Sequence, residues 1–489
     1  MPGKTKDVLF PGQSVLTMVA RLKGLFARDR KTVDMTEGDI KRHLIYFAFP
    51  LLVGNIFQQL YNMVDTWVVG NYVSNEAFSA VGSVGPIIFM IIGFFFGFSS
   101  GAGVVISQYY GAKRYDKVQD TVHTIMVMTI IFSIVMTVAG VALTPFMLDM
   151  MNTPESVVKE ARTYLYIYFG GSSGLLIYNM GSSIMRAVGD SNRPFYYLVI
   201  SACTNIVLDL VFVLVFGMGV DGVAYATIIA QGISAVLVLI ELFKTDRCIK
   251  VSIKKLKIDK EMMMKTIKIG LPSGVQMTIT SFSNVFVQSY INYFGEDFMS
   301  GWTAYSKIDQ LIFLPMQSLS LAATTFVGQN LGIHNVKRAK QGTNTALMIS
   351  VVSTVILMIP VIIFAPSLIA FFNSKAEVVN YGTILLRYLT PFYILCCANQ
   401  IYAGALRGAG NTRATMIIML ATFVGFRQLY LFVVANFISN EIIPIAMSYP
   451  AGWLMCSIAS TVYYYKVGLS SKVIQKDESS ERPAVGQKA

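Results

Sequence analysis

Charged residues are scarce in this sequence. Of its 489 residues only 13% are Asp, Glu, Lys or Arg, whereas soluble domains carry about 25%. Hydrophobic residues make up 54% of the chain, and its mean hydropathy is +0.58. So little charge over so long a chain excludes a set of soluble domains. Apolar windows recur with only short polar gaps between them, so the sequence predicts a single integral membrane domain.

Residues that commonly bind metals or form disulfides are also few. The five cysteines show no CxxC spacing and four of them lie inside apolar runs, so neither a zinc site nor a disulfide framework is expected. The three histidines lie beside Lys or Arg at the edges of loops or helices, which argues against a histidine proton relay. No HExxH, GxSxG or P-loop pattern occurs. The sequence therefore predicts no enzyme activity and no cofactor.

Basic residues outnumber acidic ones and give a net charge of +12. They are spread over short loops and the two ends of the chain, which excludes a nucleic-acid surface built from one basic patch with interleaved aromatics. The first 40 residues lack the apolar core of a signal peptide. Within them, VLTMVARLKGLFARDRK (15–31) is compatible with an interfacial amphipathic helix and with a disordered basic tail.

Twelve apolar runs are long enough to cross a bilayer, which takes roughly 20 mostly apolar residues. They lie near residues 44–69, 84–108, 121–144, 161–185, 194–216, 222–243, 264–293, 303–328, 342–364, 382–405, 414–437 and 442–465. Three prolines, Pro50, Pro272 and Pro315, lie inside these runs. We expect them to kink the helices rather than end them, because packed neighbours can satisfy the freed carbonyls.

Basic loops alternate with loops that contain no Lys or Arg. GAKRYDK, RAVGDSNR, NVKRAK and RGAGNTR are basic, whereas GMGVDG, FGEDFMSG and ISNEII are not. The positive-inside rule then predicts a multi-pass plasma-membrane protein with both termini cytoplasmic. The predicted organisation is a basic cytoplasmic tail (1–40), a first lobe (41–243), a basic cytoplasmic linker (244–260), a second lobe (261–466) and a polar cytoplasmic tail (467–489).

The second half of the chain repeats motifs of the first half at a nearly constant offset. SQYYGAKR aligns with VGQNLGIH, and RAVGDS aligns with RGAGNT. The aligned pairs include Gln108 with Gln329, Gly111 with Gly332, Arg186 with Arg407, Gly189 with Gly410, Pro50 with Pro272, and Asn62 with Asn284. Six spans, an even number, separate equivalent points. The sequence therefore predicts an all-α membrane protein with two six-helix lobes, related by a pseudo-two-fold axis along the membrane normal.

Two acids interrupt the apolar runs of the first lobe. An ionisable residue in a span costs at least ~2.5 to 3.5 kcal/mol on insertion scales, so a function or a partner is expected. Asp65, Asp209 and Thr227 all lie ~7 to 12 Å below the predicted outer surface. Asn205 precedes Asp209 by four residues and shares its helix face. We expect these four residues to form a cation-coupling site, which would be their metal site if the cation is Na⁺; hydrogen bonding between neighbouring helices is the structural alternative.

Neutral polar side chains form a stripe on the first span of each lobe. We expect them to line a substrate cavity: Gln58, Tyr61 and Asn62 in the first lobe, and Gln276, Thr280, Asn284 and Gln288 in the second. The positions that match the two acids are Val287 and Tyr430, so these acids belong to one lobe only. In the second lobe Asp309 and Arg427 are predicted to pair, either as a structural ion pair or with a direct role in coupling.

These motifs together resemble those of the multidrug and toxic compound extrusion (MATE) family over essentially all of residues 40–466. The resemblance is carried by YNMVDTWVVGNYV, SQYYGAKRYDKV, SSIMRAVGDSNRP, NIVLDLVFVLVFGMGVDGVAYAT and FLPMQSLSLAATTFVGQNLG. It implies an exporter with two lobes around a cavity, driven by inward Na⁺ or H⁺. The family's site residues fall on Asp65, Asn205, Asp209 and Thr227. The acid that some branches carry on the tenth span is missing from GTILLRYLTPFYILCCANQIYAG.

We therefore expect a monomeric antiporter that exports amphiphilic, cationic organic compounds by alternating access. The coupling ion stays open between Na⁺ and H⁺, because carboxylates can serve either. The expected partners are small organic substrates and the lipid bilayer. A flippase for lipid-linked sugars, which has a related two-lobe plan, is the main alternative, and a non-transporting scaffold is a second one.

Overall fold

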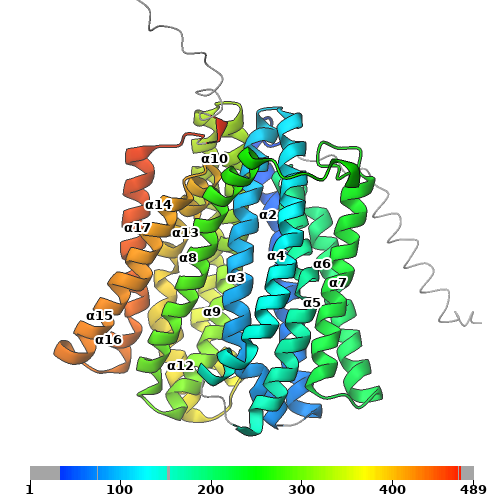
Figure 1. Cartoon of the computed structure of the whole chain (residues 1–489). Coiled ribbons are helices and arrows are strands. Elements are labelled where there is room, and N and C mark those ends of the chain that lie inside the picture. The colour runs from blue at the N-terminus through cyan, green and yellow to red at the C-terminus, as the bar shows by residue number, and fades with distance from the viewer. Residues whose placement is uncertain (1–33, 74, 151–154, 472, 475–489) are drawn as a thin grey trace, which may run out of the picture. The chain divides into compact units, whose positions relative to one another are not determined.

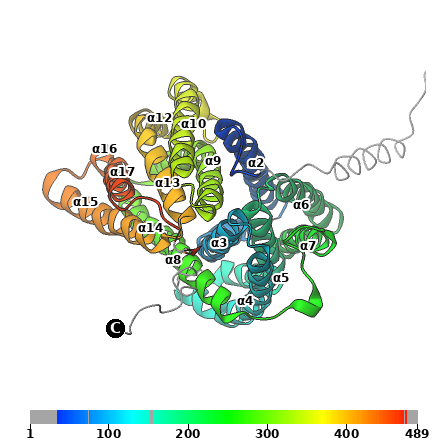
Figure 2. The same cartoon turned by 90° about the horizontal axis from the view of Figure 1, so that it is seen from above.

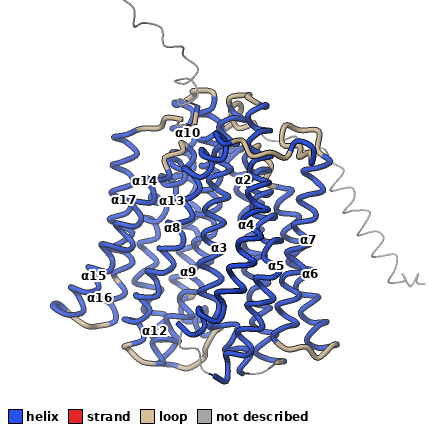
Figure 3. Tube along the Cα trace, viewed as in Figure 1, coloured by secondary structure: helices blue, strands red, loops and turns tan. Residues whose placement is uncertain are grey.

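The computed structural model describes residues 34–73, 75–150, 155–471 and 473–474, and these residues form helices and loops without any strand (Figures 1 and 3). The predicted all-α class is confirmed. The segment 15–31, for which the sequence allows an amphipathic helix or a disordered tail, lies outside the described residues.

The first lobe consists of six long helical runs in chain order. They are α2 (Ile40–Tyr72), α3 (Asn75–Gly111), α4 (Tyr115–Met150), α5 (Glu155–Ala187), α6 (Asn192–Leu210) with the π-helical turn η1 (Val211–Val215), and α7 (Val220–Lys244). A linker with one 3-10 turn, η2 (Ile253–Lys255), leads to the second lobe.

The second lobe repeats this plan with more interruptions. Its elements are α8 (Lys260–Asn292), α9 (Glu296–Gly332), α10 (Val336–Ile363), α11 (Ala365–Ala370), α12 (Ala376–Leu389), η3 (Thr390–Phe392), α13 (Tyr393–Gly408), α14 (Thr412–Met419), η4 (Leu420–Phe426), α15 (Arg427–Val433), η5 (Val434–Ile438), α16 (Ile442–Ala446) and α17 (Ser448–Val467). Because α12 to α13, α14 to η5, and α16 to α17 form three near-continuous runs, the second lobe also has six long runs.

Ten of these runs are long and apolar enough to cross a membrane within the described part of the chain. The other two long helices, α5 and α8, are richer in Gly, Ser, Thr and amide side chains, which lower their hydropathy. Each packs against several other helices, so it needs less lipid-facing surface. The twelve runs follow the predicted spans in order, and α2, α8 and α9 continue through Pro50, Pro272 and Pro315 as expected.

Both lobes begin at an aspartate N-cap. The Asp39 side chain accepts a hydrogen bond from the Arg42 N–H, and that of Asp259 accepts from the Glu261 and Met262 N–H groups. These carboxylates satisfy backbone donors that the first helical turn leaves without partners. The helices then run well beyond the predicted spans: α9 has 37 residues, or ~55 Å at 1.5 Å per residue.

The two lobes lie side by side when the bundle is viewed along its helices (Figure 2). One end of the bundle carries the loops that follow α3, α5, α9 and α13, together with the α7–α8 linker. We call it the basic end because these segments hold most of the loop Lys and Arg residues. It is the upper end in Figure 1.

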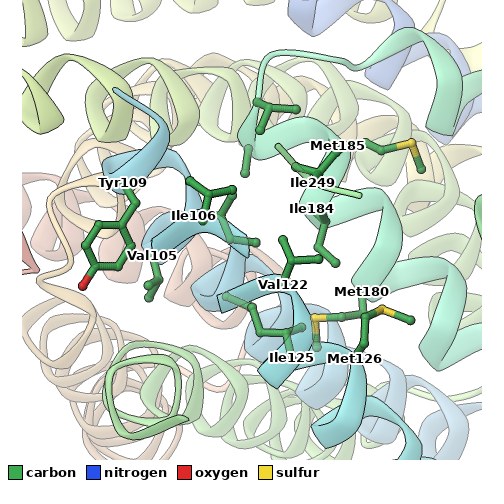
Figure 4. Packing of buried hydrophobic residues seen from close by; sticks show 14 of the residues in the cluster. Val105, Ile106, Tyr109, Val122, Ile125, Met126, Met180, Ile184, Met185 and Ile249 are labelled. Carbon is green, nitrogen blue, oxygen red and sulfur yellow. The ribbon is translucent and has the colours of Figure 1, made fainter. Parts of the chain in front are cut away.

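A hydrophobic core at the basic end joins α3, α4 and α5 (Figure 4). Ile249 of the linker and the C-terminal residues Val473 and Ile474 are buried in the same cluster. Residues 467–489 were expected to form a polar tail, but Val473 and Ile474 of that segment pack into this core. Similarly Met35, inside the predicted N-terminal tail, is fully buried, and its N–H donates to Gln329 Oε1 at 3.1 Å.

Glycines allow the lobes to touch through their backbones. A Cβ on Gly101 of α3 would lie 2.3 Å from the Gly270 Cα of α8, and one on Gly97 would lie 2.5 Å from the Ser273 carbonyl oxygen. At the basic end a Cβ on Gly111 would lie 2.0 Å from the Gln329 carbonyl oxygen. Helix backbones approach this closely only where small residues face each other.

Two hydrogen bonds at the basic end reproduce the internal repeat. Gln108 Nε2 of α3 donates to the Gly408 carbonyl oxygen at 2.6 Å, and Gln329 Nε2 of α9 donates to the Ala187 carbonyl oxygen at 2.9 Å. In the alignment of the two halves, Gln329 is the repeat equivalent of Gln108 and Gly408 is that of Ala187. The two glutamines thus make symmetric hydrogen bonds between the lobes.

Candidate functional site

The structure brings Asp65 and Asp209 together inside the first lobe. Asp65 lies on α2 and Asp209 near the end of α6, and α6 packs against both α2 and α7. Their side chains are 8% and 0% exposed, and the two carboxyl groups are close enough to interact directly. Both acids are thus buried, and they lie close to each other rather than on opposite sides of the first lobe.

Most oxygens of this acid pair have no hydrogen-bond partner in the described part of the chain. Both oxygens of Asp209 and Oδ1 of Asp65 are buried without one. The amide of Asn205, one helical turn before Asp209, is 2% exposed, and its Oδ1 and Nδ2 are likewise without partners. Buried polar groups in proteins are nearly always paired. A cluster of unpaired acceptors from two helices is therefore suited to binding a cation.

Thr227 lies on α7, which packs against α6. Its side chain is 6% exposed, and its hydroxyl donates to the Val223 carbonyl oxygen at 3.0 Å. Because the hydroxyl proton is used within its own helix, the oxygen offers only lone pairs to a ligand. Among the described residues no group of three or more His, Cys, Asp or Glu side chains gathers. A cation in the first lobe would thus take neutral oxygens beside the two carboxylates.

Tyrosine side chains lie near the acid pair. The sequence predicted only one of them, Tyr61, as a site residue. Tyr164 on α5 lies within electrostatic range of Asp65 and Asp209, and Tyr61 on α2 lies near Asp65 and Tyr168. The rings of Tyr164 and Tyr168 stack at a centroid distance of 6.2 Å. The signal was present: the two tyrosines are four residues apart in YLYIYFGG, at a depth similar to that of the acids.

The predicted pair of Asp309 and Arg427 does not form. Asp309 on α9 accepts a short hydrogen bond from the Tyr393 hydroxyl and one of 3.5 Å from the Tyr305 hydroxyl. Arg427 donates instead to Asn284 Oδ1 at 2.8 Å and to Ser283 Oγ at 3.0 Å. The prediction was wrong because the sequence shows an acid and a base within the spans of the second lobe, but not the neutral partners that neighbouring helices supply.

An aromatic ring lies near both of these charges. The Arg427 guanidinium lies 4.9 Å from the centroid of the Tyr449 ring, a cation–π contact. The same tyrosine is within electrostatic range of Asp309. Asp309 and Arg427 therefore have separate neutral partners, and Arg427 Nε is buried without a hydrogen-bond partner among the described residues.

The neutral polar residues that were predicted to line a substrate cavity differ between the lobes in their hydrogen bonds and exposure. In the second lobe, Gln276 Nε2 contacts Met419 Sδ at 2.7 Å, Asn284 holds Arg427, and Gln288 Nε2 donates to Asn292 Oδ1 at 2.8 Å. The hydroxyl of Thr280 is buried without a partner among the described residues. In the first lobe Gln58 interacts with Tyr61, and Asn62 is exposed. Of the four predicted cavity residues in the second lobe, three make side-chain hydrogen bonds within that lobe and Thr280 does not.

A model of the MatE family matches residues 50–211 and, a second time, residues 272–433. The chain belongs to the MATE family. The first match begins at Pro50 and the second at its repeat partner Pro272, which confirms the predicted internal repeat. MATE proteins are transporters and not enzymes, and this member is a multi-pass membrane protein.

Two proteins of Bacillus subtilis are similar in sequence to this MATE chain. YpnP of Bacillus subtilis, a probable multidrug resistance protein, is 29% identical over 434 residues, which cover 89% of this chain and 97% of YpnP. YoeA, a probable multidrug resistance protein of the same species, is 27% identical over 440 residues, with coverage of 88% and 95%. These relatives are described as probable multidrug resistance proteins, and they lend no support to the flippase alternative.

Solved structures share the fold. An outward-facing multidrug resistance MATE transporter superposes with a TM-score of 0.84 at 22% identity, covering 92% of this chain and 99% of that one. A transporter of Pyrococcus furiosus, described as having a binding pocket of reverse polarity, gives 0.84 at 21% identity, with coverage of 93% and 100%. The two-lobe architecture predicted from the repeat is therefore the fold of this family.

Proposed function

We propose that this MATE transporter is a secondary active antiporter that exports amphiphilic, cationic organic compounds in exchange for inward Na⁺ or H⁺. The multidrug resistance proteins to which it is similar support drug-like substrates. The observation that carries the exchange is the meeting of Asp65 and Asp209, with three of their four oxygens accepting no hydrogen bond from any other described residue.

Electrostatics explains how the acid pair would couple ion binding to movement. Two carboxylates in a medium of low dielectric constant repel each other far more strongly than in water. A proton or Na⁺ between Asp65 and Asp209 would remove that repulsion and allow α2 and α6 to stay in contact. Loss of the ion would favour their separation. The acid pair would therefore respond to ion occupancy with a change in the packing of the first lobe.

Both candidate ions fit the donor atoms. Na⁺ would take oxygens from Asp65, Asp209, Asn205 and Thr227, by analogy with other hard cations. A proton would bind one carboxyl group and leave it neutral beside the other. In either case inward movement of one charge supplies ~2.3 kcal/mol per 100 mV of membrane potential, which can drive export against a gradient.

The proposed cycle is alternating access, with the lobes rocking about the pseudo-two-fold axis. We place the basic end in the cytoplasm, following the positive-inside rule. The symmetric hydrogen bonds of Gln108 and Gln329 would then hold the inner end closed in the arrangement described here. The substrate would enter between the lobes, next to the stripe of Gln58, Tyr61 and Asn62.

Purified full-length transporter in proteoliposomes tests this function. A cationic dye is offered while a Na⁺ gradient or a pH gradient is imposed separately, without a membrane potential. We expect one of the two gradients to drive dye movement, and its identity names the coupling ion. Dye movement that follows neither gradient would contradict antiport. Binding of a lipid-linked sugar precursor without any binding of the dye would favour a flippase.

A further inference from the structure

The two ends of the described chain cross between the lobes at the basic end. Residues 34–38 precede α2 of the first lobe, yet their backbone is bound by side chains of α9 and α10 in the second lobe. Residues 471, 473 and 474 follow α17 of the second lobe, yet the last two are buried in the core that the first lobe mainly builds. We call residues 34–38 the N-terminal strap, and residues 471, 473 and 474 the C-terminal strap.

The N-terminal strap is held through its backbone. The Met35 carbonyl oxygen accepts hydrogen bonds from Asn330 Nδ2 at 3.1 Å and from Arg338 Nε at 3.3 Å. A terminal nitrogen of Arg338 donates to the carbonyl oxygens of Glu37 and Gly38 at 2.8 and 2.9 Å. One arginine of α10 thus binds three carbonyl groups of the strap, which belongs to the opposite lobe.

The C-terminal strap is held by one hydroxyl group and two apolar side chains. The Ser471 hydroxyl donates to Gln108 Oε1 of α3 at 2.7 Å and accepts from the Ile474 N–H at 3.0 Å. The side chains of Val473 and Ile474 are buried in the hydrophobic core of Figure 4. Because exposure of these apolar groups to water would cost free energy, the strap favours its docked position.

Each strap supplies a second hydrogen bond to one of the two symmetric glutamines. Ser471, which the second lobe carries, donates to Gln108 of the first lobe, and the Met35 N–H, which the first lobe carries, donates to Gln329 of the second. The amide nitrogens of both glutamines already donate to the opposite lobe. Both bonds of each glutamine therefore come from the opposite lobe and should break together when the lobes separate here.

Both straps are joined to their own lobe by short tethers. Met35 lies five residues before the start of α2 at Ile40, and Ser471 lies four residues after the end of α17 at Val467. An extended chain spans at most about 3.6 Å per residue, so the tethers reach at most ~18 Å and ~14 Å. A strap that stays joined to one lobe therefore leaves its binding site on the other lobe when the basic end opens widely.

We propose that the two straps form a lock, which holds the basic end closed while they are docked and releases as that end opens. The lock rests on the proposed alternating access, and it contributes stability that the acid pair of the first lobe does not supply. Docked straps stabilise only the closed arrangement, so they shift the equilibrium toward it. Weakening either strap should raise the share of molecules whose basic end is open.

Labelling of a cysteine at the basic end tests the lock. Ser107→Cys places a thiol on α3 at a position that is 1% exposed in the closed arrangement, so a water-soluble maleimide should reach it only when this end opens. Mass spectrometry of the full-length transporter in detergent measures the labelling rate at residue 107 separately from the native cysteines. The measurement needs neither a substrate nor an ion gradient, so its result is distinguishable from that of the antiport test.

Two strap variants are made in the Ser107→Cys background. Arg338→Met and Ser471→Ala are each expected to raise the labelling rate at least about threefold, the shift expected for the loss of one hydrogen bond. Lys337→Met, which removes an exposed charge beside Arg338 on α10, and Ser470→Ala, beside Ser471, are the matched controls. Both controls should leave the rate unchanged.

Native cysteines separate opening of the lock from unfolding. Cys396 and Cys456 are fully buried in the second lobe and should stay unlabelled in every variant. If Arg338→Met does not fold, Arg338→Gln replaces it, with a smaller rise expected. A rise at residue 107 alone supports the lock even where neither gradient drives dye movement. Unchanged rates in both strap variants, or an equal rise at Cys396 and Cys456, would overturn the proposal.

Discussion

At the scale of single residues, the two lobes treat their buried charges in opposite ways. In the second lobe Asp309 accepts hydrogen bonds from tyrosine hydroxyls, and one terminal nitrogen of Arg427 donates to neutral oxygens while its guanidinium lies over an aromatic ring. In the first lobe Asp65 and Asp209 meet each other, and most of their oxygens accept nothing from the described chain. Free acceptors are available to a ligand and saturated ones are not, so the first lobe is the one equipped for cation binding.

Loss of either acid should therefore stop the coupled movement of ion and substrate. We expect Asp65→Asn and Asp209→Asn each to lower gradient-driven dye uptake at least about tenfold, because one ion–carboxylate contact is worth more than about 1.4 kcal/mol. Asp221→Asn, which changes an acid in the first turn of α7, is the control and retains uptake. Wild-type uptake by both site variants at equal expression would remove the acid pair from the mechanism.

The charges of the second lobe should prove energetically independent. In a double-mutant cycle on the free energy of unfolding, Asp309→Leu and Arg427→Met are expected to couple by less than about 0.5 kcal/mol. The pair Asp309→Leu and Tyr393→Phe should couple by about 1 to 3 kcal/mol, because they share a hydrogen bond to a charged group. A larger coupling for the first pair would show that the two charges do interact.

At the scale of helices, irregular turns mark the segments that carry buried polar groups. The π-helical turn η1 directly follows Asp209 and Leu210, and η4 directly precedes Arg427. Such turns are rare and are frequent at functional sites. Nothing in the hydropathy of residues 205–215 or 420–427 signals them, because a π-turn depends on which neighbours accept the displaced backbone groups.

Close helix packing in this bundle depends on glycine at particular positions. Gly101→Ala should lower the thermal midpoint of the purified protein by at least about 2 °C, since its new Cβ would meet the backbone of α8 and overpacking costs about 1 to 3 kcal/mol. Gly170→Ala is the matched control, because nothing lies within 4 Å of the Cβ it would add. That control should leave the midpoint unchanged or raise it. Equal midpoints for both variants would contradict the packing of α3 on α8.

At the scale of the whole molecule, several close contacts join the lobes at the basic end. A Cβ on Gly328 of α9 would lie 3.1 Å from the Ser107 Cβ of α3, close to the about 3.5 to 4.5 Å of a disulfide. Alternating access requires α3 and α9 to separate at this end during each cycle. The distance between these two positions therefore reports the state of the transporter.

A covalent link at this point should trap one state. Under oxidising conditions Ser107→Cys combined with Gly328→Cys is expected to abolish dye transport, and a reducing agent should restore it. Each single cysteine variant serves as a control and should transport under both conditions. Transport that continues after complete cross-linking, as judged by mass spectrometry, would refute movement of the lobes at the basic end.

The sequence by itself determined the membrane class, the order of the helices and the two-fold repeat. These follow from local composition, from the length of apolar runs and from the constant rise of an α-helix. Only the tertiary structure decided which polar groups find partners: Tyr393 with Asp309, Asn284 with Arg427, and Asp65 with Asp209. Those pairings depend on side chains from helices distant in sequence, and hydropathy contains no record of how such helices are rotated against each other.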